Sequence, residues 1–221
     1  MAAFGGAAAC LAVILGLALA MPSITARFSG ADYGGGMTAS IFSGGSLGYL
    51  VVGLLAFALG TLYWTLHLLL RRETPQIFYV SDLAWVASFV FLLALALTLP
   101  GEEERRCRAG ACWLVPAVCL PQFALYVTHG DILFNVLMCG MTMLLAWCAL
   151  RGLVWAGRSG DGRLRPFHRA VLAFTVLEYA LWTSSCFWVG DTLANPYFWF
   201  DFLLSLVLLL LLPAAGKAVA P

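Results

Sequence analysis

The chain has 221 residues, of which 62% are hydrophobic and only 10% are Asp, Glu, Lys or Arg. A soluble globular domain contains about 25% charged residues, and a single core could not bury this much apolar surface. The formal net charge of +1 offers no excess of positive charge for binding nucleic acid. The composition therefore excludes a soluble enzyme, a disordered chain and a nucleic-acid-binding protein, and it indicates a polytopic membrane protein.

A helix that crosses a bilayer needs about 20 mostly apolar residues, and seven stretches of the chain meet this requirement. In chain order they cover residues 4–24, 47–70, 78–99, 111–127, 132–155, 171–189 and 197–215. We therefore expect an all-α fold, with a single seven-transmembrane-helix bundle spanning residues 1–221. The stretch at 111–127 is short and contains Pro116 and Pro121, so we expect it to be kinked.

Two segments near the N-terminus need separate interpretation. Residues 1–6 contain no Lys or Arg, and the apolar run after them is longer than the core of a usual signal peptide. A retained helix at 4–24 is therefore favoured over a cleaved signal peptide. The Gly- and Ser-rich stretch at 29–46 is expected to form a flexible or re-entrant loop.

The basic residues predict the orientation, because Lys and Arg are enriched in cytoplasmic loops. Ten of the twelve lie near or beyond the C-terminal ends of the first, third, fifth and seventh stretches, and only Arg71 and Arg72 lie on the other side. We therefore expect the N-terminus outside and the C-terminus in the cytosol. The sequence predicts an integral, multi-pass membrane protein without distinguishing the plasma membrane from an endomembrane.

Three carboxylates fall at the outer ends of predicted spans: Asp82, Asp131 and Asp201. One interpretation is that they cap helix N-termini, where negative charge is favoured, while nearby Trp and Tyr residues form the interfacial belt. The alternative is a shared polar pocket that opens to the outer side. This alternative draws support from Asp82 and Asp201, which lie within apolar stretches, where an ionisable residue is by default a candidate for function.

Glu178 is the most isolated charge, because it lies near the middle of the 171–189 stretch. An ionised Asp, Lys or Arg at the centre of a span costs about 2.5–3.5 kcal/mol on insertion scales. We expect the Glu178 side chain to face the bundle and to be protonated or hydrogen-bonded. The candidate partners are Asn135, Gln122, Thr61 or a tyrosine, and the role is either structural contact between helices or proton relay and ligand binding.

A weak internal similarity links two parts of the chain. LGTLYW at 59–64 precedes Asp82, and LEYALW at 177–182 precedes Asp201, with nearly equal spacing from Trp to Asp. The two helical hairpins could be parallel repeats of one unit. His67, His129 and Asp191 lie at the same outer level as Asp82, Asp131 and Asp201, and aromatic residues accompany them. The candidate ligand-binding residues are Asp82, Asp201, Tyr197, His67, Trp64 and Glu178.

Four features carry a family resemblance: LAMPSI at 19–24, SDLAWVASF at 81–89, the charged turn PGEEERR at 100–106, and YFWFD at 197–201 followed by a Leu-rich run and a Lys-containing tail. With this layout the chain resembles the seven-span superfamily of alkaline ceramidases, adiponectin-receptor-like proteins, the post-GPI-attachment phospholipase and myomaker. The closest resemblance is to the myomaker-like branch.

The resemblance implies a zinc site built from histidines of the second and last spans, supported by an Asp and a Ser. Asp82 matches the Asp, whereas the Ser and the first His fall near Gly60 and Trp64. The final His pair falls on Tyr197 and Asp201. Trp cannot bind zinc and Tyr is a poor ligand for it, so we expect no metal cofactor. The zinc ligands that remain as candidates are His67, Asp82 and Asp201.

These observations favour a non-catalytic integral membrane protein: receptor-like, a scaffold or a subunit of a membrane complex. Its expected partners are the lipid bilayer, other membrane proteins and a lipid or small-molecule ligand, but no nucleic acid. Two alternatives stay open. One is a metal-dependent membrane lipid hydrolase that uses Asp82, Asp201, His67 and His129. The other is a small-solute transporter that uses the repeated hairpin and Glu178.

Overall fold

Every regular element in the described part of the chain is a helix. The structure is a computed structural model, which describes residues 37–71, 80–188 and 194–219. The elements are α2 (Met37–Arg71), α3 (Val80–Thr98), α4 (Glu102–Arg106), the 3₁₀ helix η1 (Gly110–Trp113), α5 (Leu114–Val127), α6 (Ile132–Ser159), α7 (Arg165–Phe187) and α8 (Pro196–Val219). The prediction of an all-α fold is confirmed for these residues.

Six helical segments among the described residues are long and apolar enough to cross a membrane. They are Gly48–Arg71, Val80–Thr98, Gly110–Val127, Ile132–Ser159, Arg165–Phe187 and Pro196–Ala218. Each corresponds to one of the predicted stretches from the second to the seventh, because an apolar chain in lipid must satisfy its backbone polar groups within a helix. The first predicted span, at residues 4–24, lies outside the described residues.

Several helix boundaries differ from the predicted ones. The loop predicted at 29–46 is wrong for residues 37–46, which form the first turns of α2. This segment has two glycines but no proline, and a glycine costs a helix only about 1 kcal/mol. Helix α6 also runs past its predicted end at residue 155, and α7 begins before its predicted start at residue 171. They leave a short turn in which Gly160, with φ of +76°, ends α6 in the left-handed conformation that glycine adopts without strain.

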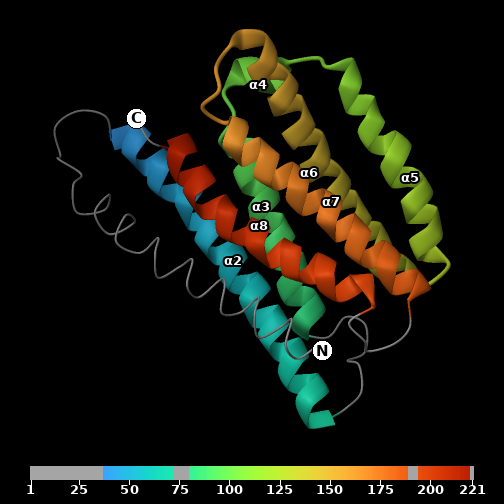
Figure 1. Ribbon diagram of the computed structural model, residues 1–221. Helices are drawn as coiled ribbons and strands as arrows, with labels where there is room; N and C mark the ends of the chain where they lie inside the picture. The colour runs from blue at the N-terminus through green and yellow to red at the C-terminus, as the bar shows by residue number, and fades with distance from the viewer. Residues whose placement is uncertain (1–36, 72–79, 189–193, 220–221) are drawn as a thin grey trace.

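Five of the described helices pack as a ring. In chain order, α2 contacts α3, α3 contacts α6, α6 contacts α7, α7 contacts α8, and α8 returns to α2. Helix α5 lies outside this ring, against α6 and α7 (Figure 1). The helices therefore enclose a common interior, and residues far apart in the sequence can face one another across it.

The half of the ring nearer α4 is filled by apolar side chains. Phe89 of α3 and Phe174 of α7 are almost fully buried, and their ring centroids are 5.2 Å apart. The same cluster contains buried leucines from every helix of the ring, among them Leu54, Leu145 and Leu208. This packing closes the ring at the end that carries α4.

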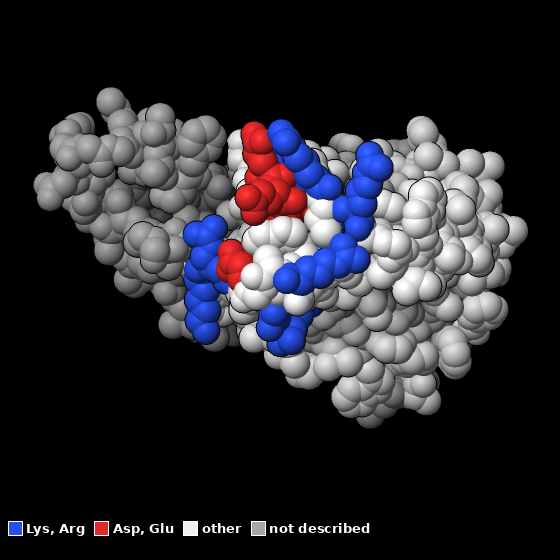
Figure 2. All heavy atoms as spheres, turned by 90° about the horizontal axis from the view of Figure 1, so that it is seen from above, with Lys and Arg blue, Asp and Glu red and all other residues white. Residues whose placement is uncertain are grey.

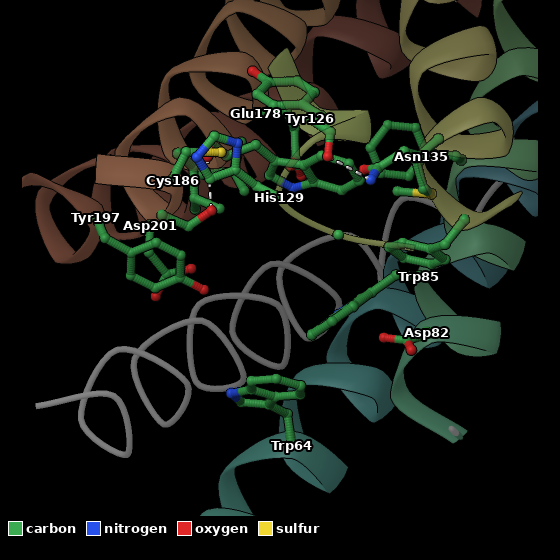
Figure 3. Close-up of a pocket in the computed structure, with 18 of the residues that line it drawn as sticks. Trp64, Asp82, Trp85, Tyr126, His129, Asn135, Glu178, Cys186, Tyr197 and Asp201 are labelled. Atoms are coloured by element: carbon green, nitrogen blue, oxygen red, sulfur yellow. Dashed lines mark hydrogen bonds between the residues drawn. The ribbon is translucent and has the colours of Figure 1, made fainter. Parts of the chain in front are cut away.

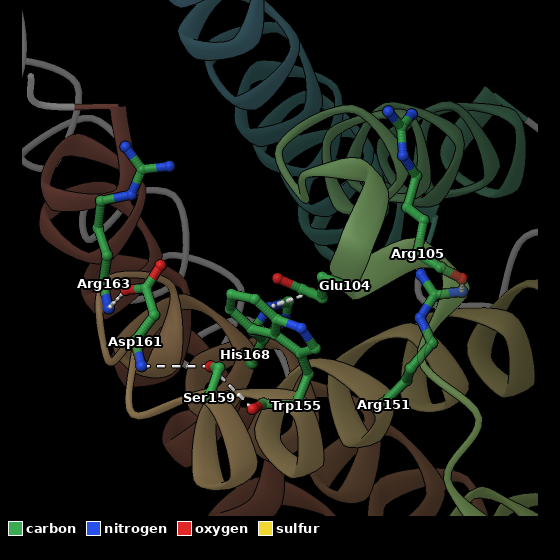
Figure 4. Close-up of polar contacts among 8 residues, drawn as sticks. All are labelled: Glu104, Arg105, Arg151, Trp155, Ser159, Asp161, Arg163 and His168. Carbon is green, nitrogen blue, oxygen red and sulfur yellow. Dashed lines mark hydrogen bonds and ion pairs between the residues drawn. The ribbon is translucent and has the colours of Figure 1, made fainter.

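Charged side chains gather at the α4 end of the bundle (Figure 2). The segment 102–113 is held there by contacts to α6 and α7. Nη1 of Arg158 donates to the carbonyl oxygen of Arg108 over 3.1 Å. Nε2 of His168 in α7 lies 2.8 Å from Oε1 of Glu104 in α4, and both side chains are buried (Figure 4). The His168 ring lies against Gly152 of α6, where a Cβ atom would overlap it.

Candidate functional site: a cavity opposite α4

The end of the ring remote from α4 contains a cavity of about 670 Å³. All five helices of the ring line it, together with the C-terminal end of α5. Its lining includes the last turns of α5 and α7, the first turns of α3, α6 and α8, and the part of α2 from Phe57 to Trp64 (Figure 3). The lining residues are Phe57, Thr61, Trp64, Asp82, Trp85, Phe89, Tyr126, His129, Gly130, Phe134, Asn135, Met138, Glu178, Leu181, Trp182, Ser185, Cys186, Tyr197, Asp201 and Leu204.

The structure brings together five of the six candidate ligand-binding residues. Trp64, Asp82, Glu178, Tyr197 and Asp201 all line the cavity. The sixth candidate, His67 of α2, is not part of the lining. The α2 residues that reach the cavity follow the helical repeat from Phe57 through Thr61 to Trp64, and the His67 ring lies beside the Tyr63 ring instead, with centroids 5.9 Å apart.

Glu178 and Asp201 reach the cavity from adjacent helices. Glu178 is only 7% exposed, and Asp201 is close enough for the two carboxylates to interact electrostatically. Within the described residues, no hydrogen bond is made to either carboxylate; Ser205 bonds to the backbone oxygen of Asp201. The two groups are therefore left to interact with whatever occupies the cavity.

The hydrogen-bond partners expected for Glu178 are engaged elsewhere. Nδ2 of Asn135 donates over 3.0 Å to the carbonyl oxygen of Tyr126 at the C-terminal end of α5, which also accepts from the backbone N–H of His129. The hydroxyl of Thr61 donates to the Phe57 carbonyl oxygen one turn back in α2, at 3.0 Å. Gln122 belongs to α5, outside the ring. Backbone carbonyl oxygens thus accept the hydrogen bonds that Asn135 and Thr61 were expected to donate to Glu178.

The other polar residues of this level have separate roles. Asp131 caps α6, because its Oδ1 accepts from the backbone N–H of Phe134 over 2.9 Å, and it does not line the cavity. The helix-cap interpretation therefore fits Asp131. His129 does line the cavity, while its Nδ1 lies 3.0 Å from the Leu125 carbonyl oxygen. Asp191 lies outside the described residues.

Aromatic rings form much of the cavity wall. The centroids of Trp64 and Trp85 are 5.6 Å apart, and Phe134 stacks on Trp182 at 5.8 Å with an interplanar angle of 17°. The indole N–H of Trp85 donates to Oγ1 of Thr61 over 3.3 Å, which fixes the ring against α2.

Gly60 permits the close approach of Trp85 to α2. A Cβ atom at this position would lie 2.9 Å from Cδ1 and Nε1 of Trp85 and 3.0 Å from the Ser81 carbonyl oxygen, inside the distance that real Cβ contacts allow. The glycine that the family resemblance aligned with a serine therefore serves helix packing at the cavity wall.

Sequence reasoning did not assign Trp85, Trp182, Phe134 or Tyr126 to the site. Tryptophan and tyrosine at the end of a span are typical of the interfacial belt, so they gave no separate signal. The spacing between acidic and tryptophan residues could have identified Trp85 and Trp182. Trp85 follows Asp82 by three residues and Trp182 follows Glu178 by four, which places each pair on one helix face.

The residues present do not assemble the zinc site that the family resemblance implies. Among the described residues, no three His, Cys, Asp or Glu side chains form a group that could hold a metal ion. His67 in particular is outside the cavity that Asp82 and Asp201 share. The absence of a metal cofactor stays a prediction, which metal analysis of the purified protein can test.

Comparisons with known proteins identify no relative. No family model, no curated protein and no solved structure matches the chain. The resemblance to the ceramidase and adiponectin-receptor superfamily therefore stays a prediction, and the geometry of the cavity is the basis for a functional proposal.

Proposed function

We propose that the protein is a non-catalytic, receptor-like integral membrane protein that binds a small ligand inside its helical bundle. The observation that carries this proposal is the cavity of about 670 Å³ between the helices of the ring. Ligand sites in proteins typically occupy about 300–1,000 Å³, have mostly apolar walls and present a few convergent polar groups. This cavity combines such walls with the carboxylates of Asp82, Glu178 and Asp201.

The proposed orientation places the cavity on the outer side of the membrane. The α4 end carries most of the described basic residues, in the α4–α5 loop, at the junction of α6 and α7, and at Lys217 of α8. The opposite end contributes Arg71 alone among the described basic residues. By the positive-inside rule, the α4 end is cytosolic. With residues 4–24 as a further span, the protein has seven spans and an external N-terminus.

A function without catalysis is supported by the residues at the positions where the resembled hydrolases bind zinc. Trp64 and Tyr197 stand at two of these positions and contribute aromatic wall to the cavity. A catalytic zinc needs three protein ligands and an open position for water, and Trp64 cannot be one of them.

A small-solute transporter is the second candidate, favoured by the placement of the two similar hairpins. Trp64 and Asp82 line the cavity from α2 and α3, while Trp182 and Asp201 line it from α7 and α8. A substrate site between two structural repeats is typical of secondary transporters. Solute uptake into proteoliposomes distinguishes this function from ligand binding alone.

The experiment for the proposed function uses Cys186, which lines the cavity, and Cys107, which lies at the α4 end. Two full-length variants each keep one of these cysteines, with the other cysteines changed to Ala. Thermal unfolding in detergent is measured against a library of lipids and small molecules. We expect compounds that stabilise both variants, and we expect a bulky maleimide on Cys186, but not on Cys107, to abolish the stabilisation. A library with no stabilising compound, or equal effects of the two labels, contradicts the proposal.

A further inference from the structure

The charges of the cavity wall restrict the kind of ligand that it can bind. Three carboxylates line the cavity, those of Asp82, Glu178 and Asp201, and none of its lining residues in the described part of the chain is Lys or Arg. The carboxylates of Glu178 and Asp201, which line the cavity from adjacent helices, would repel an anionic ligand at short range. The wall therefore favours a ligand that is positively charged.

Glu178 strengthens this restriction because its side chain is buried but lacks a hydrogen-bond donor. It is 7% exposed, lines the cavity, and accepts no hydrogen bond from any described residue. The carboxylate of Asp201, on the adjacent helix, interacts with it electrostatically. Burying a carboxylate without a compensating partner is costly, and a cation within the cavity would compensate Glu178 and Asp201 together.

Several hydrogen-bond donors of the wall are already in use. The Trp85 indole N–H donates to Thr61, and the Asn135 amide donates to the Tyr126 carbonyl. The Tyr126 hydroxyl lies 2.8 Å from the Tyr179 carbonyl oxygen, to which it donates. The carboxylates of Glu178 and Asp201 offer acceptor oxygens to the cavity, which suits a ligand that brings positive charge or donors, and the hydroxyl of Tyr197 lines the same space.

The size and the aromatic walls indicate an organic cation in place of a bare metal ion. A single ion would leave most of the 670 Å³ unfilled, and the described residues offer no group of three metal ligands. The tryptophans Trp64, Trp85 and Trp182 line the same space as the carboxylates. Aromatic faces attract ammonium groups through cation–π interactions, and Trp does so most strongly.

We propose that the cavity binds an organic cation, with its ammonium group beside Glu178 and Asp201 and its apolar part against Trp64, Trp85 and Trp182. This inference rests on the proposed ligand-binding function and adds the chemical class of the ligand. The carboxylates select the charge, and the aromatic rings provide the area for the hydrocarbon part.

The test compares two probes of nearly equal shape and different charge. Choline carries a quaternary ammonium, and 3,3-dimethyl-1-butanol has a neutral carbon in its place. Binding of both to the full-length protein, purified in an uncharged maltoside detergent, is measured by calorimetry. We expect choline to bind about tenfold more tightly or better, which corresponds to about 1.4 kcal/mol. Tetrabutylammonium, which fills more of the cavity, should bind more tightly than choline.

Substitutions of the acidic residues test whether choline binds beside Glu178 and Asp201. Glu178→Gln and Asp201→Asn keep the shape of the side chain, and each should weaken choline binding by about tenfold while leaving the neutral probe unchanged. Glu103→Gln and Asp161→Asn are the matched controls, because these acidic residues are exposed near the α4 end, and they should alter neither probe. Thermal unfolding verifies that each variant is folded.

The outcomes separate the two proposals. Equal affinity for choline and its neutral counterpart, or choline binding that survives both acidic-residue variants, overturns the cation inference. Ligand binding that the Cys186 label still blocks would then leave the proposed function in place. Failure of every probe, charged or neutral, together with failure of the library, overturns both.

Discussion

Glu178 of α7 and Asp201 of α8 line the same cavity from adjacent helices, and neither carboxylate accepts a hydrogen bond from a described residue. Burial of two like groups without donors does not stabilise a fold. Their juxtaposition is better explained by what the cavity holds than by contacts between helices.

The first prediction concerns the stability of Glu178→Gln without ligand. If Glu178 served as structural contact between helices, its loss would destabilise the protein. We expect the reverse, because the amide removes an uncompensated carboxylate beside Asp201. A gain of about 1 kcal/mol would raise the unfolding temperature by about 2–4 °C for a chain of this size, measured by thermal unfolding in detergent. A lower unfolding temperature would identify Glu178 as a structural residue.

The second prediction concerns the wall formed by α2 and α3. Gly60→Ala should displace Trp85, since the new Cβ would lie 2.9 Å from the indole ring, and overpacking of this kind costs about 1–3 kcal/mol. Gly48→Ala in the same helix is the control, because nothing lies within 4 Å of its Cβ position. We expect a lower unfolding temperature and altered tryptophan fluorescence for Gly60→Ala only. Equal behaviour of the two variants would contradict the packing described here.

The third prediction concerns the α4 end, where His168 pairs with Glu104 and lies against Gly152. Gly152→Ala should destabilise the protein because its Cβ would overlap the His168 ring. Gly140→Ala in the same helix has an open Cβ position and should not. In a His168→Ala background, the cost of Gly152→Ala should largely vanish, as measured by a double-mutant cycle of unfolding temperatures. Additive effects would show that the two residues are not coupled.

The fourth prediction concerns orientation. A membrane-impermeant maleimide added to intact cells should label the variant that keeps only Cys186, at the cavity end, and not the variant that keeps only Cys107, at the α4 end. After the cells are permeabilised, the reagent should label Cys107 as well. Labelling of Cys107 alone in intact cells would reverse the proposed orientation.

The spans were predictable because length and apolar composition determine which segments can cross a bilayer. The residues at which the spans begin and end were less predictable from the sequence. Helix α6 continues through Arg151 and Arg158 to Ser159, because a helix can extend beyond the apolar core and place charged side chains in the polar region. The faces that turn toward the ring were not predictable, since apolar residues surround most of each helix and leave no clear amphipathic pattern.

The candidate site was partly predictable because ionisable residues are rare in apolar helices. Asp82, Glu178 and Asp201 are ionisable groups in apolar helices, and such groups turn toward the interior of a bundle. His67 does not line the cavity, because its position on α2 departs from the helical repeat of Phe57, Thr61 and Trp64. In the folded protein, Asn135 and Thr61 donate to backbone carbonyl oxygens. The sequence does not reveal these bonds, so it could not exclude the two residues as partners of Glu178.

The most direct measurement of the central claim is a crystal structure of the full-length protein with tetraethylarsonium, whose arsenic atom scatters anomalously. The account predicts an anomalous peak inside the cavity, within about 6 Å of an aromatic ring centroid, and next to the carboxylates of Glu178 and Asp201. The peak should disappear in the Glu178→Gln, Asp201→Asn double variant. An empty cavity beside fully ordered Glu178 and Asp201 side chains, or a peak that persists in the double variant, would contradict it.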